Sequence, residues 1–389
     1  MSKNVSRVAK SLIPYGTSVF TQISDLARRT NAVNLSQGFP DFDGPLEIRQ
    51  LAAQGILHGP NQYAPSIGVS SLRLAVSQKM ARFYNVNVCP DTEVTVTAGA
   101  TEALSAALLG IVNPGDEVIV LDPSYDLYPA IIARAGGRPV HVSLVAPDFY
   151  LDEEALTKAF SRRTKAIVIN NPQNPCGKVF SLAELQLIGD LCQRFDAIAI
   201  GDEVYEHLVY DGNRHHTLLA VESLRDRAIV ISSTAKTFSM TGWKVGFAVA
   251  SPQLSEAVRM AHQFLTFCTP GMFQEAMATA IASDDAYYRD LLADYSRRRN
   301  WLADALEALK FRVLRSAGTY FLNILIDLDT HGDDLAFCVH LAEKVGVAAI
   351  PASFFYKDRR RGRDMVRFCF CKQDSTLCAA IERLQARRQ

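Results

Sequence analysis

Short apolar runs alternate with segments of helical spacing through the middle of the chain, and this alternation constrains the fold more than any other feature. Each run is short and mainly apolar, as is typical of a buried strand. The runs cover residues 94–97, 117–121, 139–143, 166–170, 197–201, 228–231 and 245–250. Because strands that alternate with helices form parallel sheets covered on both faces, the sequence predicts an α/β fold with a mostly parallel sheet.

The remainder of the chain predicts an arm and a smaller α+β domain. After residue 252, helices are expected near 286–309, 334–345 and 375–386, and strands near 321–326, 347–350 and 366–371. We predict an N-terminal arm at residues 1–45 that packs with the small domain. A large domain is expected at 46–283 and a small C-terminal domain at 284–389.

The composition indicates a soluble globular protein without an affinity for nucleic acid or membranes. The 389 residues are 48% hydrophobic and 21% charged, and Lys plus Arg equals Asp plus Glu at 41 each. No overall charge therefore attracts polyanions, and no apolar run approaches membrane-spanning length. The eight cysteines contain no C-x-x-C pair, and Cys369 and Cys371 alternate along an expected strand. We expect a cytoplasmic protein with reduced cysteines and no metal site.

A lysine-containing segment at residues 232–247 lies between two expected strands and carries many hydroxyl groups. Burying an ammonium without a partner is costly, so Lys236 needs an explanation. One resolution is covalent, because an amine that forms a Schiff base with an aldehyde gives up its full charge. The alternative is a polar loop with a solvated lysine, and a short motif alone favours that alternative.

Other polar residues follow the expected strands, at the edge where parallel sheets bind ligands. Asp202 ends one strand and Tyr205 follows it, although an Asp there can also cap a helix. Asn174 lies in N-N-P-Q-N-P-C-G, which is also ordinary turn chemistry. Residues 98–103 link a strand to a helix expected from Thr101, whose free amides can bind an anion.

The pattern S-x-x-K-T-F-S-M-T-G-W-K-x-G, together with N-P-x-N-P-x-G, resembles class I aminotransferases that use pyridoxal 5′-phosphate (PLP). The resemblance extends over nearly the whole chain. It implies the fold type I architecture of PLP-dependent transferases, in which a large domain with a seven-stranded-type, mostly parallel sheet between helices binds PLP. A smaller α+β domain completes that architecture.

The same resemblance assigns roles to individual residues. It implies that Lys236 holds the PLP aldehyde and acts as the general base, with Asp202 at the pyridine nitrogen and Tyr205 and Asn174 at the phenolate oxygen. The remaining PLP-binding residues would be Gly99, Ala100, Thr101, Ser233 and Lys244 at the phosphate, Tyr125 on the pyridine face, and Tyr63 from the neighbouring subunit. The chain is therefore expected to form a homodimer with shared sites. Lys244 departs from the arginine of many members, so phosphate binding is expected to be weaker.

Arg367, flanked by strand residues, is the expected site for the substrate carboxylate. A planar guanidinium can take a carboxylate with two parallel hydrogen bonds, although a buried structural ion pair is the alternative. Gly38 resembles the family residue whose amide contacts the same carboxylate, and Asn174 and Tyr15 would complete the substrate site.

The donor is expected to have an apolar or aromatic side chain. Five short motifs resemble the branch of methionine aminotransferases and kynurenine/glutamine transaminases: G-W-K, P-Y-G-T, S-Q-G-F-P-D-F-D-G-P, N-Q-Y-A-P and V-A-A-I-P. Residues 261–270, which resemble a segment near the substrate, hold no Arg or Lys. Tyr15 and residues 353–356 would add aromatic surface. The basic run at 357–363, expected as a solvated loop, could supply a cation if it folded toward the pocket.

We therefore predict a ping-pong aminotransferase whose donors are methionine, phenylalanine, tyrosine, kynurenine or glutamine rather than aspartate. The acceptor is a 2-oxo acid. The alternative within PLP chemistry is a cysteine-conjugate or cystathionine-type β-lyase. A PLP-sensing regulator would need an appended DNA-binding domain, and the segment before Gly38 is too short for one.

Overall fold

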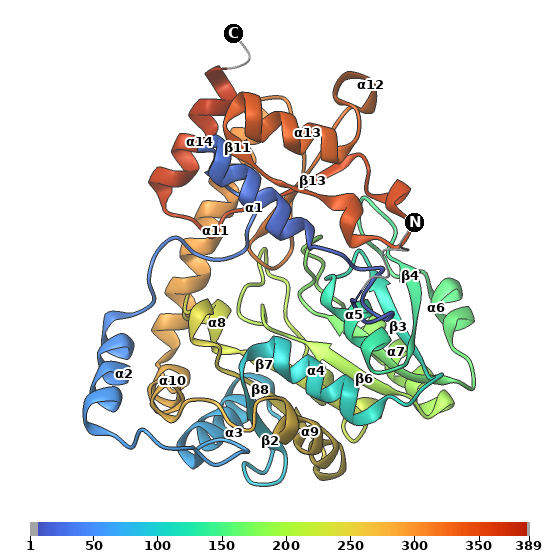
Figure 1. The fold of residues 1–389 in the computed structure, drawn as a ribbon, viewed down its shortest axis with the longest axis vertical. Coiled ribbons are helices and arrows are strands. Elements are labelled where there is room, and N and C mark those ends of the chain that lie inside the picture. The colour runs from blue at the N-terminus through green and yellow to red at the C-terminus, as the bar shows by residue number, and fades with distance from the viewer. Residues whose placement is uncertain (1–6, 387–389) are drawn as a thin grey trace.

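The computed structural model describes residues 7–386. These residues form a large domain, in which helices cover a sheet, and a smaller domain, which contains the C-terminal part of the chain and lies above the large domain in Figure 1. The large sheet has seven strands in the order β2-β8-β7-β6-β5-β3-β4. The strands are β2 (Val94–Thr97), β3 (Glu117–Asp122), β4 (Arg138–Ser143), β5 (Thr164–Asn170), β6 (Ile198–Asp202), β7 (Ala228–Ser233) and β8 (Gly246–Ala250). Strand β8 runs antiparallel to β2 and β7, and the other adjacent pairs described are parallel. The predicted mostly parallel α/β sheet is confirmed.

Alternating side chains of the strands bury both faces of this sheet. Ile229 and Ile231 of β7 join one apolar cluster, whereas Val230 joins the cluster on the opposite face. The first cluster includes α4 (Gly99–Ile111), α5 (Leu127–Arg134) and α9 (Pro252–Leu265). The second includes α3 (Ser70–Tyr84), α6 (Glu153–Ala159), α7 (Leu182–Phe195) and α10 (Gly271–Ile281). Helices therefore cover both faces, as the strand–helix alternation predicts.

The second domain is built on an antiparallel sheet in the order β12-β13-β10-β9. Its strands are β9 (Arg312–Leu314), β10 (Phe321–Leu325), β12 (Ile350–Pro351) and β13 (Met365–Cys369), and its helices include α11 (Asp285–Ala308), α12 (Leu328–His331), α13 (Asp334–His340) and α14 (Asp374–Ala386). Cys369 and Cys371 are buried in its core.

Two sequence-based boundaries in this domain are wrong. The strand expected at 347–350 is two strands, because β11 (Val347–Ala348) pairs with β1 (Val33–Asn34) while β12 pairs with β13. The helix expected at 334–345 ends as an α-helix at His340, and a π-helical turn, Leu341–Val345, follows it.

The N-terminal arm packs against the second domain, as Figure 1 shows for α1 (Val19–Thr30). Val19, Ile23 and Leu26 of α1 belong to the same apolar cluster as the core of the small sheet. The backbone of Leu35 bonds to Ala348 and to Cys369, which ties the arm to two strands. The chain then crosses to α2 (Leu46–His58) beside the large domain. The exact domain boundaries remain a prediction.

Short elements and caps complete the framework. Ser181 and Glu184 form a reciprocal capping box at the start of α7, and Asp284 caps α11. The single-turn helix α8 (Thr234–Thr237) directly follows β7, and 3₁₀ turns occupy Leu218–Ala220, Glu222–Leu224, Thr241–Trp243, Ala352–Phe355 and Arg359–Arg361. Within residues 7–386, no helix has the length and apolar character needed to cross a membrane.

Candidate active site

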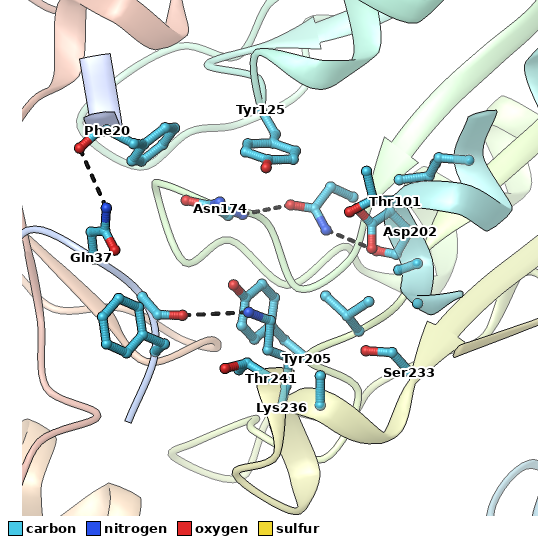
Figure 2. Close-up of a pocket in the computed structure, with 18 of the residues that line it drawn as sticks. Phe20, Gln37, Thr101, Tyr125, Asn174, Asp202, Tyr205, Ser233, Lys236 and Thr241 are labelled. Carbon is cyan, nitrogen blue, oxygen red and sulfur yellow. Dashed lines mark hydrogen bonds between the residues drawn. The ribbon is translucent and has the colours of Figure 1, made fainter. Parts of the chain in front are cut away.

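A cavity of about 430 Å³ lies beyond the carboxyl ends of β5, β6 and β7, between the large sheet and the arm with the small domain (Figure 2). Its size suits a small-molecule ligand. Twelve of the site residues expected from the sequence line it: Gly38, Gly99, Ala100, Thr101, Tyr125, Asn174, Asp202, Tyr205, Ser233, Lys236, Lys244 and Arg367. Residues more than 300 positions apart in the chain thus meet in one cavity.

Lys236 extends from α8 into the cavity, where its Nζ lies 3.4 Å from the carbonyl oxygen of Gly38. The rings of Tyr205 and Tyr320 lie 5.8 Å and 5.6 Å from the same nitrogen. Desolvation by the surrounding protein lowers the pKa of Lys236. A lowered pKa enriches the neutral amine, which is the form that attacks an aldehyde or accepts a proton.

Asp202, at the end of β6, presents one free carboxylate oxygen. Its Oδ2 accepts a hydrogen bond of 2.6 Å from the Tyr128 hydroxyl. Its Oδ1 is buried and finds no hydrogen-bond partner among residues 7–386. Burial raises the pKa of Asp202, and the Tyr128 hydrogen bond opposes that rise. Because a buried acceptor without a donor is costly, Oδ1 fits a ligand that brings a cationic N–H group.

The loop after β5 is held against Asp202 by a short hydrogen-bond chain. Asn170 accepts a hydrogen bond of 2.7 Å from the Asn174 amide and donates one of 2.8 Å to the carbonyl of Asp202. Tyr205 is buried beside them, and burial raises the pKa of its phenol. The hydroxyl therefore stays protonated at neutral pH and can donate to an anionic oxygen.

The first turn of α4, Ser233 and Lys244 surround the end of the cavity nearest the large sheet. The helix begins at Gly99, two residues earlier than expected, so the amides of Gly99 and Ala100 belong to its first turn. Gly99 has a φ of +77°, and a Cβ there would lie 3.2 Å from the Lys244 Nζ. Free amides, a helix N-terminus and an ammonium together suit a phosphate group.

Arg367, in β13, is fixed on the opposite side of the cavity. Its Nη1 donates to Asn174 Oδ1 at 2.7 Å and its Nη2 donates to the Ser36 carbonyl at 2.8 Å. The guanidinium lies 3.9 Å from the Phe321 ring centroid and 5.2 Å from that of Phe20. Within the described part of the chain no carboxylate pairs with it, so the geometry does not support a structural ion pair.

Gly38 approaches the same region with its backbone. A Cβ at this position would lie 2.5 Å from the Phe321 ring, so the close approach requires glycine. Its carbonyl accepts a hydrogen bond from the Tyr320 hydroxyl in addition to the contact with Lys236.

Tyr15 and Tyr63 lie outside this cavity. The Tyr15 hydroxyl donates to the Pro129 carbonyl at 2.7 Å and lines a separate hollow beside the arm. Tyr63 is 84% exposed and packs edge-on against Phe267, with 5.4 Å between ring centroids.

The segments expected to shape the donor pocket also lie elsewhere in the described chain. Residues 261–270 and 353–356 do not line the cavity; Phe355 packs on Phe20 behind Arg367. The basic run does not line the cavity; Arg359 stacks on Phe354, and Arg360 pairs with Asp358. The aromatic surface inside the cavity includes Phe20, Phe39 and Phe321, which the sequence did not indicate.

Several lining residues were not expected: Ser18, Phe20, Gln37, Phe39, Leu104, Tyr128, Asn170, Val204, Ala235, Thr241 and Phe321. Gln37 directly precedes Gly38, and Asn170 lies in the same motif as Asn174, so the sequence could have indicated both as site residues. Tyr128 lies three residues after Tyr125, a spacing that places both on one side of a helical turn. Phe20 and Phe321 gave no comparable signal, because tertiary packing alone brings them to the cavity.

The cavity thus combines an amine, a carboxylate with a free oxygen, an anion cradle and a separate guanidinium, which together fit PLP and an amino acid. Residues 30–384 match the family model "Aminotransferase class I and II". The chain belongs to this family, whose members of this fold are PLP-dependent enzymes.

Two kinds of aminotransferase are similar to this chain in both sequence and structure. The chain is 45% identical to a probable N-succinyldiaminopimelate aminotransferase of Mycobacterium tuberculosis, over 96% of both chains. A solved M. tuberculosis structure of that name covers 97% of this chain and 99% of its own, with a TM-score of 0.94. The chain is 41% identical to the methionine aminotransferase of Escherichia coli, over 97% of this chain and 98% of the relative. A solved E. coli structure described as having that function covers 98% of this chain and 100% of its own, with a TM-score of 0.93.

Proposed function

We propose that this aminotransferase takes the amino group of L-amino acids with apolar, aromatic or neutral side chains, such as methionine, phenylalanine, tyrosine, kynurenine or glutamine. The observation that carries the proposal is the make-up of the cavity wall around Arg367. Phe20 and Phe321 pack on the Arg367 guanidinium and Phe39 lines the same cavity, while the other lining cations, Lys236 and Lys244, lie toward the large sheet. An acidic side chain would need a second cation, whereas apolar side chains gain about 25 cal/mol per Å² of surface withdrawn from water.

We assign the cofactor side of the cavity to PLP, which supplies an aldehyde and an electron-accepting ring when bound. Lys236 would hold the aldehyde, and the free Asp202 Oδ1 would hold the pyridine nitrogen protonated. Tyr205 and Asn174 are assigned to the phenolate oxygen and Tyr125 to the ring face. The assigned phosphate ligands are Gly99, Ala100, Thr101, Ser233 and Lys244.

On the substrate side, Arg367 and the backbone at Gly38 would hold the α-carboxylate, which fixes the donor's Cα near the Lys236 Nζ. Lys236 would then take the proton from Cα and return a proton to the cofactor side of the site. The lowered pKa of Lys236 supports this role, because the base must be neutral to accept the proton. The cycle has two halves, in which the donor leaves as a 2-oxo acid before the acceptor enters.

We further propose a homodimer in which Tyr63 reaches the phosphate in the partner subunit. Tyr63 is almost fully exposed in one chain and adjoins an apolar groove lined by Leu51, Pro60 and Met272. Phe264, at the end of α9, is 85% exposed. Exposed aromatic and aliphatic side chains of this kind are typical of an interface.

Subunit mixing tests this arrangement. Dimers that combine one Tyr63→Phe subunit with one Lys236→Ala subunit should regain one intact site. If activity does not recover despite verified subunit exchange, each site is built from one chain.

The donor class is tested by comparing kcat/KM for methionine, phenylalanine, aspartate and N-succinyl-diaminopimelate with a common 2-oxo acid. We expect methionine or phenylalanine to exceed aspartate by at least about tenfold, the effect of roughly 1.4 kcal/mol. A clear preference for aspartate or for the succinylated donor, which ends in an additional carboxylate, would contradict the proposal. Release of pyruvate and ammonia from a cysteine conjugate without any acceptor would instead support the β-lyase alternative.

A further inference from the structure

The segment that carries Asp202 and Tyr205 alternates cavity-lining residues with buried carboxylates. Asp202, Val204 and Tyr205 line the cavity. Glu203 and Glu206 are both buried and are not among its lining residues. Glu203 is paired with His215 at 3.0 Å and accepts a 2.9 Å hydrogen bond from the Leu218 amide. Each carboxylate thus anchors this segment from outside the cavity.

Glu206 makes more contacts than Glu203 does. The Lys79 Nζ lies 2.5 Å from its Oε2, and the Tyr84 hydroxyl donates to the same oxygen. The Ser232 hydroxyl donates to its Oε1 at 2.5 Å. Lys79 and Glu206 are 4% and 3% exposed, so the ion pair is withdrawn from water.

Through Glu206, these contacts join the segment after β6 to helix α3 and to strand β7. Lys79 and Tyr84 belong to α3, and Ser232 belongs to β7. Ser232 directly precedes Ser233 and lies four residues before Lys236. The Glu206 carboxylate therefore connects the segment that presents Asp202 and Tyr205 to the strand that leads to Lys236.

The energetics of a buried pair point to positioning rather than to stability alone. Burial would raise the pKa of Glu206, yet the Lys79 ammonium lowers it, to about 2. A fully desolvated ion pair gives up most of its Coulombic gain, and apolar residues of similar volume often stabilise a protein equally well. Apolar residues would not, however, fix the carboxylate's three directional contacts, and such supporting contacts determine how precisely a site is held.

We propose that Lys79 and Glu206 are positioning residues for the aminotransferase reaction. They hold Asp202 and Tyr205 in register with Ser233 and Lys236 without touching the ligand. This inference rests on the roles proposed above for Asp202 and Lys236. It goes beyond the family's PLP ligands, because neither residue lines the cavity.

The test is the double variant Lys79→Met/Glu206→Gln, loaded with PLP, which removes both charges with little change in volume. We expect kcat to fall by at least about tenfold while the donor KM and the bound PLP content change little. We also expect the pH midpoint of the absorbance change of bound PLP to shift by about half a unit or more, because Asp202 and Tyr205 would move relative to the cofactor. A purely structural role would lower thermal stability and leave kcat and this midpoint unchanged.

Glu117→Gln is the matched control. Glu117 is also a buried carboxylate that accepts from Ser161 and pairs with Arg138 and Arg163. It lies at the start of β3, at the end of the strand opposite the cavity. Glu117→Gln should lower thermal stability but leave kcat within about twofold of wild type and leave the midpoint unchanged.

Two further variants separate the possible failures. If the double variant does not fold, Ser232→Ala decides, because it removes only the contact to β7. A wild-type kcat and midpoint in Ser232→Ala, or in a folded double variant, would overturn the inference. When the inference is overturned in this way, Asp202→Ala shows how much else fails. If Asp202→Ala still changes kcat and the pH midpoint, only the positioning claim fails. If Asp202→Ala changes neither kcat nor the midpoint, the proposed active site fails as well.

Discussion

The two walls of the cavity are built in different ways. The wall from the large sheet takes its polar groups from the carboxyl ends of parallel strands and the segments that follow them, as Asp202 ends β6 and Ser233 ends β7. The opposite wall combines α1, the loop at Gln37 and strands β10 and β13. Figure 2 shows this contrast, with Thr101, Asp202 and Ser233 on one side and Phe20 and Gln37 on the other. The first wall suits an invariant cofactor, and the second offers shape and apolar surface for a variable donor.

The contrast predicts two kinds of kinetic effect. Substitutions in the large-sheet wall should slow all donors equally and alter the cofactor spectrum. Substitutions in the opposite wall should act on substrate binding and leave bound PLP intact. Each of the following variants tests one side of this division.

Lys236→Ala should have the largest effect. It removes both the covalent attachment point and the base, so kcat should fall by about 10²–10⁴-fold or more, the range expected for general base catalysis. The phosphate cradle remains, so PLP should still bind, but without a linkage that borohydride reduces. The measurement is turnover together with mass spectrometry after reduction. Near-normal turnover with a reducible linkage would show that another residue holds the cofactor.

Arg367→Leu should lower kcat/KM by roughly 10²–10³-fold, as expected when one partner of a buried charge pair is lost. Every amino donor carries the α-carboxylate, so the loss should be similar for methionine, phenylalanine and aspartate. PLP content should be unchanged, since Arg367 lies on the opposite wall. Arg367→Lys is the matched variant and should recover only part of the activity, because an ammonium lacks the bidentate fork. A loss confined to kcat, with a lower content of bound PLP, would place Arg367 on the cofactor side.

Tyr128→Phe should have a smaller effect, about tenfold on kcat, because it deletes one hydrogen bond to the charged Asp202. That bond opposes the rise in the pKa of Asp202 caused by burial, so the pKa should rise further in the variant. The carboxylate would then hold the pyridine nitrogen less firmly. The check is kcat for two donors, which should fall by the same factor. Unequal falls would assign Tyr128 to substrate selection.

The smallest predicted effect concerns acid stability. The pKa of Glu206 is lowered to about 2 in the folded protein, against 4.5 as its ordinary value. Its contribution is therefore complete above pH 4.5 and is lost as the pH falls from 4.5 toward 2. Glu206→Gln should lower the melting temperature at pH 7, and the difference from wild type should shrink at pH 4 and below. Asp196→Asn, which changes a fully exposed carboxylate, is the control and should show no such convergence. A constant difference across this range would mean that Glu206 does not titrate as described.

The same contrast explains what could be predicted from the sequence. The groups at Lys236, Asp202 and Asn174 lie in local motifs after recognisable strands, and the topology of a parallel sheet brings them together. Phe20 and Phe321 reach the cavity only through packing of the arm on the small domain, which no local pattern encodes. The split of residues 347–351 has a similar cause, because β11 and β12 pair in different sheets. Apolar character predicts strands there but not their partners.

The most direct test of the central claim is a half-reaction of the PLP-loaded protein with L-methionine and no 2-oxo acid. The proposed chemistry predicts a change in cofactor absorbance and release of one 2-oxo acid per active site, after which the reaction stops until an acceptor is added. Lys236→Ala should show neither event at a comparable rate. Continued release of oxo acid and ammonia without an acceptor, or no spectral change with methionine, phenylalanine, tyrosine, kynurenine and glutamine, would contradict the account.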